Sequence, residues 1–248
     1  MTGGAADRSL SVGATRAGLA RRLATLLVAL AVPVVIAGVV LGLFFNPLWV
    51  GFEQERTGVA AITGFSPADV RAVTGSILWD VVIGPPRFDV RVAGQPVLDA
   101  AERAHMVDVH RVLLRVGAVV LLALAVLLAL GWRGRRDAWF WRGATWGAGV
   151  LAGLVVLVGA VFAVAFDQAF LVFHELFFPG GDFEFDPRTQ RLVQIFPEAF
   201  WFETVLAIAL GGLALAVAVA LVARRRAHLL DAGPASRASE GRPGGGPR

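Results

Sequence analysis

Four long runs of apolar residues dominate the chain, and more polar segments separate them. Each run holds about 19–24 residues, enough for a helix to cross a hydrocarbon core of roughly 30 Å. The first run is longer than the apolar part of a cleaved signal peptide, about 7–15 residues, so we predict that it is retained. The chain is therefore predicted to be an all-α integral membrane protein, a bundle of four transmembrane helices with a small, mainly helical extracytoplasmic segment. The runs are Leu23–Phe45, Val112–Leu130, Ala144–Phe166 and Phe200–Ala223.

Helix signals also occur after the first run. Ser66, Pro67 and Asp69 supply an N-cap residue, a proline at the first helical position and an acidic residue three positions beyond the cap. Apolar residues follow at helical spacing as far as Val81. The pattern predicts a short amphipathic helix that ends at Gly84–Pro86.

Two of the membrane helices are predicted to continue beyond the lipid. One begins at Asp99, with Glu102 as its capping partner, and no proline or glycine interrupts it before the second run. The third run likewise meets no helix breaker before Pro179–Gly181, so its helix is predicted to continue unbroken to Phe178. Both extensions lie on the same side of the membrane.

The distribution of arginine predicts the orientation. The N-terminal tail, Arg133–Arg142 and the tail from Arg224 hold fourteen of the 23 arginines. Asn46–His110 and Asp167–Glu203 hold seven, together with fifteen of the 19 acidic residues. Because positively charged loops remain in the cytoplasm, both termini are predicted to be cytoplasmic. The chain contains no lysine and much alanine, glycine and valine, a base-composition bias that indicates a bacterial protein. We therefore expect a multi-pass protein of the bacterial cytoplasmic (inner) membrane with its active face extracytoplasmic.

This orientation gives the expected domain organisation. Residues 1–22 form a cytoplasmic N-terminal tail, and residues 23–223 form the membrane domain, with extracytoplasmic segments 46–111 and 167–199. Residues 224–248 form a cytoplasmic tail, predicted to be disordered because glycine, proline, serine and arginine are frequent beyond Leu230.

Composition agrees with a membrane protein and excludes several kinds of chemistry. Hydrophobic residues make up 56% of the chain and charged residues 17%, with a mean hydropathy of +0.68. The absence of cysteine excludes disulfides, thiolate metal sites and a cysteine nucleophile. The pI of about 11.2 results from arginines that lie mostly in the predicted cytoplasmic segments, as the positive-inside rule requires. The basic pI is therefore a sign of topology, and no nucleic-acid partner is expected.

Two histidines are the leading candidates for chemistry. Arg111 and Asp167 mark the expected outer lipid boundary. His105 lies six residues before Arg111, and His174 lies seven residues after Asp167. On continuous helices the histidines would stand ~9 and ~10 Å above that boundary. Similar heights on two different helices allow them to form one site.

The neighbours of the histidines suggest supporting roles. Glu102, Asp108 and Asp167 are candidate carboxylates that orient a histidine and raise its basicity. A wall suited to acyl chains is predicted from the phenylalanines around His174, which are Phe170, Phe173, Phe177 and Phe178.

Structural interpretations stay open for each of these positions. Either histidine can be a satisfied polar group at the interface, and His110 and His228 are interpreted as boundary residues. Arg115 lies inside the second run, where it is a candidate substrate contact, or it extends to the surface or pairs with Asp167 or Glu203. A metal held by the histidines and nearby carboxylates lacks a compact ligand motif, so neither a metal nor a cofactor is expected.

Several stretches resemble a bacterial family of four-helix membrane proteins that includes the lipoprotein intramolecular transacylase. Together with the pattern of spans they cover most of residues 23–223. The two histidine-containing stretches, in this order and at this spacing, are the most specific. The stretches are Phe45–Leu48, Ala104–Val109, Ala169–Phe178, Phe185–Pro187 and Phe196–Phe200.

The resemblance implies an acyltransferase that acts on bacterial lipoproteins. In that reaction an acyl chain moves from the sn-2 oxygen of the diacylglyceryl group to the α-amino group of the lipidated cysteine. The family's two important histidines would correspond to His105 and His174. One would deprotonate the nucleophile and the other would stabilise the oxyanion, with His174 favoured as the base.

Two other functions remain as alternatives. Another lipid-directed enzyme, an acyl hydrolase or a phospholipid acyltransferase, would use the same outer site. A membrane scaffold or chaperone would need the histidines only for packing. The expected partners are a lipoprotein or another lipid substrate and the membrane lipids.

Overall fold

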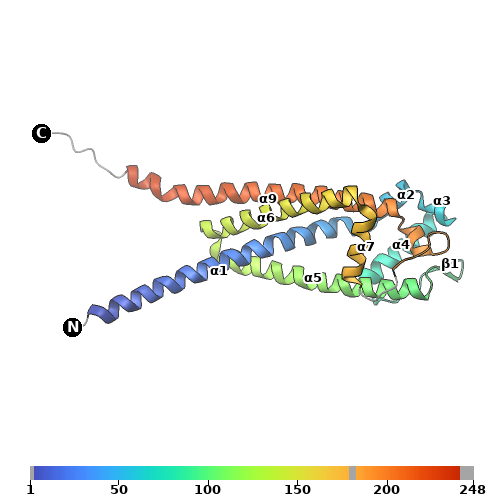
Figure 1. The fold of residues 1–248 in the computed structure, drawn as a ribbon, viewed down its shortest axis with the longest axis horizontal. Coiled ribbons are helices and arrows are strands. Elements are labelled where there is room, and N and C mark those ends of the chain that lie inside the picture. The colour runs from blue at the N-terminus through green and yellow to red at the C-terminus, as the bar shows by residue number, and fades with distance from the viewer. Residues whose placement is uncertain (1–2, 179–182, 241–248) are drawn as a thin grey trace. The chain divides into compact units, whose positions relative to one another are not determined.

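The computed structural model describes residues 3–178 and 183–240, with side chains for 15–178 and 183–232. Four of its helices are long and apolar enough to span a membrane, as predicted. They are α1 (Gly3–Phe44), α5 (Ala100–Gly134), α6 (Ala138–Val164) and α9 (Glu198–Glu240). Figure 1 shows these helices and the shorter elements that connect them.

The shorter elements follow α1 and α6. They are α2 (Pro47–Arg56), α3 (Val59–Thr63), α4 (Pro67–Val82), a two-stranded antiparallel sheet of β1 (Arg91–Val92) and β2 (Gln95–Pro96), α7 (Phe166–Phe177) and α8 (Arg191–Ile195). The predicted amphipathic helix is confirmed as α4. The Ser66 side chain accepts a hydrogen bond from the Asp69 backbone, and the apolar residues at helical spacing are buried.

The chain divides into two compact units. The first contains residues up to Ile36, Leu121–Gly153 and residues from Ala214. In it, α6 packs closely on α1 at Gly143 and Gly147, where an added Cβ would come within 2.7 Å of the Thr25 carbonyl oxygen and 2.4 Å of that of Ala29. Small residues four positions apart allow membrane helices to approach this closely.

The second unit contains Ala37–Val120 and Leu154–Leu213. Its hydrophobic core lies among the short elements, the start of α5 and the start of α9. Met106 belongs to this core, which fixes the first turns of α5 and leaves the adjacent His105 half-buried at the edge of the core. Other core residues are Val50, Val73, Ile77, Phe88, Leu98, Ile195 and Phe200.

The prediction of a continuous helix from Ala144 to Phe178 is wrong. The α6 helix ends at Val164, Ala165 leaves the helical region with φ −142° and ψ 51°, and α7 begins at Phe166. No proline or glycine marks this break. The Phe166 ring instead packs against Phe170 at 5.6 Å and Phe202 at 5.5 Å between centroids, and these contacts favour the change of direction. The predicted helix stop at Pro179–Gly181 lies outside the described residues.

The prediction of a disordered tail from Arg224 is wrong for the part of it that the structure describes. The α9 helix continues from the fourth span to Glu240, and residues 241–248 lie outside the described residues. Arginine, alanine and leucine dominate residues 224–230, and all three are strong helix formers. Asp231 also pairs with Arg142 of α6 at 2.8 Å, which ties this part of α9 to the first unit.

Candidate active site

His105 and His174 lie beside each other in the second unit. Their rings are nearly parallel, with 6.0 Å between centroids and an interplanar angle of 22°. His105 comes from the second turn of α5 and His174 from the last turns of α7. The helix α7 runs across the direction of the last part of α6, residues 154–164 (Figure 1). The ring contact places His174 of α7 beside His105 of α5. The two histidines meet as predicted, but by a turn of the chain rather than by equal heights on two straight helices.

Phenylalanine rings surround the pair. Phe178 is buried and contacts both histidines, with 5.0 Å between its centroid and that of His105 and 5.6 Å to that of His174. Phe170 lies 4.1 Å from the His174 ring and Phe173 lies 5.4 Å from it. Phe177 contacts Phe173 at 4.8 Å and is exposed.

Two further phenylalanine rings contact the histidines and were not predicted from the sequence. Phe183 lies 5.2 Å from the His174 ring and Phe185 lies 5.5 Å from the His105 ring. The alternating Phe183-Glu184-Phe185 pattern was the available signal, since an extended segment presents alternate side chains to one face. Both residues lie in the described segment 183–186, which has no regular secondary structure.

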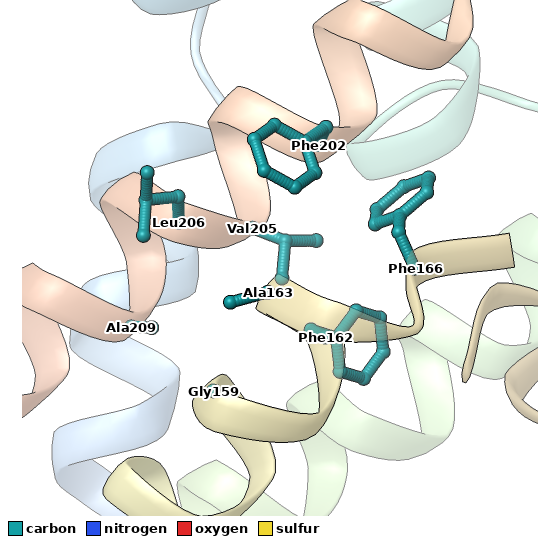
Figure 2. A pocket seen from close by; sticks show the side chains of 8 residues that line it. All are labelled: Gly159, Phe162, Ala163, Phe166, Phe202, Val205, Leu206 and Ala209. Atoms are coloured by element: carbon teal, nitrogen blue, oxygen red, sulfur yellow. The ribbon is translucent and has the colours of Figure 1, made fainter. Parts of the chain in front are cut away.

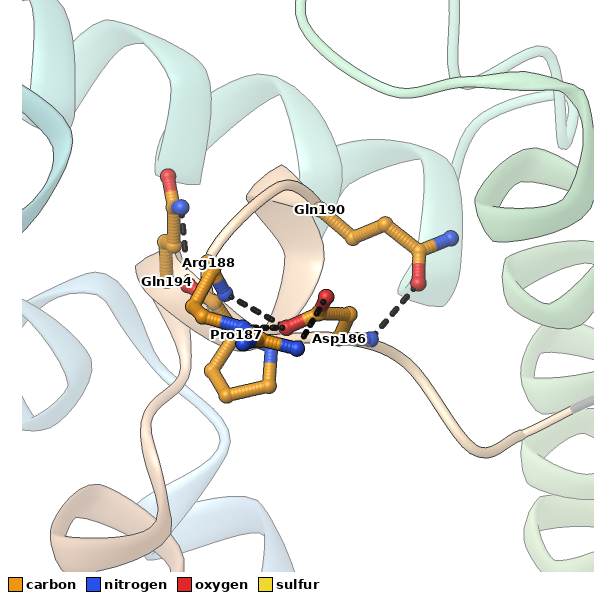
Figure 3. Close-up of polar contacts among 5 residues, drawn as sticks. All are labelled: Asp186, Pro187, Arg188, Gln190 and Gln194. Atoms are coloured by element: carbon orange, nitrogen blue, oxygen red, sulfur yellow. Dashed lines mark hydrogen bonds and ion pairs between the residues drawn. The ribbon is translucent and has the colours of Figure 1, made fainter.

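Polar contacts fasten this segment to the start of α5. The Gln190 side chain accepts a hydrogen bond from the Asp186 backbone and donates one to the Asp99 carboxylate at 3.1 Å. Figure 3 shows the Asp186–Gln190 contact beside the ion pair of Arg188 with Asp186, which holds the pKa of the Asp186 carboxyl below its usual value. The Gln194 side chain donates to the Pro187 carbonyl. These contacts hold Phe185, one residue before Asp186, against His105.

The His174 side chain is held in a defined tautomer. Its Nδ1 lies 2.8 Å from the Phe170 carbonyl oxygen, which can only accept a hydrogen bond. Nδ1 therefore carries the proton, and in the neutral ring Nε2 has a lone pair available. Burial lowers the pKa of His174 below its usual value, and the hydrogen bond to Phe170 opposes that shift only in part. His174 is thus a neutral imidazole near pH 7 that can accept a proton at Nε2.

The predicted supporting carboxylates make other contacts. Glu102 is 1% exposed, and its two oxygens accept hydrogen bonds from the backbone of Asp99 at 2.6 Å and of Leu192 at 2.7 Å. The predicted capping box at the start of α5 is confirmed by the first of these bonds and by its reciprocal from Glu102 N–H to Asp99. Asp108 pairs with Arg111 at 2.6 Å, and Asp167 lies exposed on α7.

Glu102 consequently acts as a structural anchor for both α5 and α8. We predict that Glu102→Ala lowers the free energy of unfolding by about 2–3 kcal/mol, because the buried Leu192 N–H and the part-buried Asp99 N–H both lose a charged acceptor. Thermal unfolding in detergent measures this change, with the exposed Glu55→Ala on α2 as the control. A variant with wild-type stability and reduced activity would instead favour direct assistance to His105.

The remaining candidates occupy separate places. His110 is buried, with Nδ1 2.9 Å from the Val81 carbonyl oxygen, and so joins α5 to α4. His228 and Arg115 are exposed, on α9 and α5 respectively. Glu203, one of the partners considered for Arg115, pairs with Arg56. Among the described residues, no group of three or more metal-ligating side chains is found.

A shallow apolar cleft lies between the end of α6 and the start of α9 (Figure 2). Phe166 lines this cleft, and its ring stacks on that of Phe170, which in turn contacts His174. A row of aromatic rings in contact therefore links the lining of the cleft to His174. Its other lining residues are Gly159, Phe162, Ala163, Phe202, Val205, Leu206 and Ala209.

Comparison with known proteins agrees with this arrangement. A family model described as lipoprotein intramolecular transacylase Lit matches residues 24–201. No match is found among curated proteins. The solved in meso structure of the membrane-integral lipoprotein intramolecular transacylase Lit from Bacillus cereus is similar, with a TM-score of 0.70 and 19% identity, covering 84% of this chain and 96% of that chain. A variant of that protein with one histidine replaced by arginine gives a TM-score of 0.71 at 16% identity, covering 87% and 96%.

The solved structures, at below 25% identity, show that this chain shares their four-helix membrane fold. The family model covers well over half of the chain and includes both histidines. This chain is therefore a multi-pass membrane protein that belongs to the lipoprotein intramolecular transacylase (Lit) family.

Proposed function

We propose that this protein transfers the sn-2 acyl chain of a lipoprotein's diacylglyceryl group to the α-amino group of the same lipoprotein's lipidated cysteine. Membership of the Lit family supports the substrate and the reaction. The single observation that carries the mechanism is the histidine pair, with rings 6.0 Å apart and Nδ1 of His174 occupied by a backbone carbonyl.

His174 is proposed as the general base. Its Nε2 takes a proton from the α-amino group as the nitrogen attacks the ester carbonyl, so that a C–N bond forms. The tetrahedral intermediate then expels the sn-2 oxygen, the C–O bond breaks, and the imidazolium returns the proton to that oxygen. The products are an amide and a free hydroxyl, and no covalent enzyme intermediate is required.

His105 is proposed as the hydrogen-bond donor to the oxyanion. Its ring lies close enough to that of His174 for both to contact one ester group. Such a donor stabilises charge that develops only in the transition state. Because donor and acceptor belong to one molecule, holding the substrate compact makes the transfer effectively unimolecular.

The surrounding aromatic rings are proposed to bind acyl chains. Phe170, Phe173 and Phe178 contact the histidine rings directly, and the exposed Phe173 and Phe177 extend this surface towards the outside of α7. Arg115 is proposed to contact the lipid from its exposed position on α5.

We further propose that both termini are cytoplasmic and that the histidine pair faces the extracytoplasmic side of the bacterial inner membrane. The asymmetry of arginine supports this orientation. Reporter fusions after Arg136 and Arg226 should be active in the cytoplasm, and a fusion after Gly84 should be active outside it. The reverse pattern would place the histidines in the cytosol and exclude the proposed site.

The acid limb of the pH profile tests His174 as the base. The pKa of His174 is lowered by burial, so the midpoint of its protonation in the folded protein lies below the usual value of 6.5. The value of kcat/KM, which reports the free protein, should therefore fall with decreasing pH along a limb centred below pH 6.5. A loss of rate already centred above pH 6.5 would contradict a desolvated base at this position.

Expression in a bacterium whose lipoproteins carry a free amino terminus tests the proposed function. Their diacylglyceryl-cysteine should become N-acyl, S-monoacylglyceryl-cysteine, with no change in total mass. Unmodified amino termini in cells that express the protein well would contradict the transacylase assignment. Loss of acyl mass would indicate a hydrolase.

A further inference from the structure

The helix α7 exposes one apolar face. Leu176 is 71% exposed and Val172 59%, and Phe173 and Phe177 are also exposed. Val172 and Leu176 are four residues apart, as are Phe173 and Phe177, and Phe173 and Leu176 are three apart, so the four side chains form one continuous surface. We refer to Val172, Phe173, Leu176 and Phe177 as the apolar face of α7.

The other side of the same helix is polar. Asp167 and Glu175 are exposed there, with Leu171, 40% exposed, between them, and His174 is buried at the edge of this side against Phe178. The helix thus separates an apolar side from a polar one over only twelve residues. An amphipathic helix of this kind either packs its apolar face on protein or places it in lipid.

The position of α7 favours lipid. It follows directly from the membrane-spanning α6, whose last residue, Val164, is 86% exposed and whose Val161 and Val158 are exposed as well. The apolar face of α7 therefore follows directly on an exposed apolar surface of a helix that is long and apolar enough to span the membrane. A twelve-residue helix is about 18 Å long, too short to span the membrane. Figure 1 shows it running across the direction of the last part of α6, as a helix in the plane of the membrane would.

We propose that α7 is an interfacial helix whose apolar face is embedded in the acyl chains of one membrane leaflet. The phospholipid leaflet supplies the partner that this face lacks within the protein. His174 lies on the same short helix, so the position of α7 in the leaflet sets the depth of the histidine. This inference concerns the membrane position of α7 and holds whether or not the protein is a transacylase.

The absence of native cysteine allows a direct test with single-cysteine variants. Leu176→Cys and Val172→Cys place a spin label on the apolar face, and Glu175→Cys and Asp167→Cys on the other side of the helix are the matched controls. All four side chains are exposed in the protein, so a difference between the pairs must come from the surroundings. The full chain is reconstituted in nanodiscs of phosphatidylethanolamine and phosphatidylglycerol. Collision with oxygen, which concentrates in lipid, is compared with collision with a water-soluble nickel chelate.

The labels at 172 and 176 should show a ratio of oxygen to nickel collisions severalfold higher than the labels at 167 and 175. Equal ratios at all four positions would overturn the proposal, because α7 would then lie wholly in water or wholly in lipid. Labels at 172 and 176 that neither reagent reaches would also overturn it, since protein and not lipid would then cover the face.

Discussion

Replacing His174 with alanine should lower the rate of acyl transfer by about 10²–10⁴-fold, the usual effect of losing a positioned acid or base. The hydrogen bond from its Nδ1 to the Phe170 carbonyl leaves Nε2 as the one basic atom of the ring. His174→Gln should not restore the rate, because an amide can accept a hydrogen bond but cannot take up a proton at neutral pH. The rate is followed by mass spectrometry of a purified lipopeptide substrate.

The choice of a control histidine follows from the structure. His110→Ala is unsuitable because His110 is buried and bonded to the Val81 carbonyl, so its loss would disturb the packing of α5 on α4. His228 is exposed on α9, in the unit that does not contain the histidine pair. His228→Ala should transfer the acyl chain at the wild-type rate. A His174→Ala variant as active as this control would remove His174 from the mechanism.

Replacing His105 with alanine should also be severe, with a loss of about 10²–10³-fold, the effect of removing one donor to an oxyanion. Here a glutamine should recover part of the rate, because its amide N–H can donate to the oxyanion in place of the imidazole. The different response to glutamine at the two positions separates the donor from the base. Recovery by glutamine at 174 and not at 105 would exchange the two assigned roles.

Much of the fold could be predicted because its signals are local. The four spans follow from the lengths of the apolar runs, and α4 follows from the Ser66 cap and the apolar residues after it. The capping box of Asp99 and Glu102 places the start of α5 correctly. Each of these features depends on residues within a few turns of one another.

The site depends on contacts that local signals do not reveal. The break at Ala165 has no proline or glycine, and it is favoured by packing of Phe166 on Phe202, far away in the chain. The partner of Glu102 on α8, the Leu192 N–H, is 90 residues distant. Phe183 and Phe185 contact the histidine rings because the residues that follow them are bonded to the start of α5, as by the hydrogen bond from Gln190 to Asp99.

The extension of α9 beyond Arg224 shows a different limit. Residues 224–230 favour a helix by their composition. The glycine, proline and serine that follow them favour disorder, and the prediction extended this disorder to the whole tail. The ion pair of Asp231 with Arg142, 89 residues earlier, joins this part of α9 to α6. Charge and composition alone could not identify that partner.

A crossover experiment tests the central claim, intramolecular acyl transfer, most directly. Two diacylglyceryl-lipopeptides of different sequence are mixed, one with a deuterated sn-2 chain, and are incubated with the protein in proteoliposomes. Fragmentation in a mass spectrometer then locates the acyl chain on each peptide. We predict that the deuterated chain moves to the amino nitrogen of its own peptide and never to the other, with the mass of each peptide unchanged. Deuterated acyl chains on the second peptide, or peptides whose amino nitrogen stays unacylated, would contradict the claim.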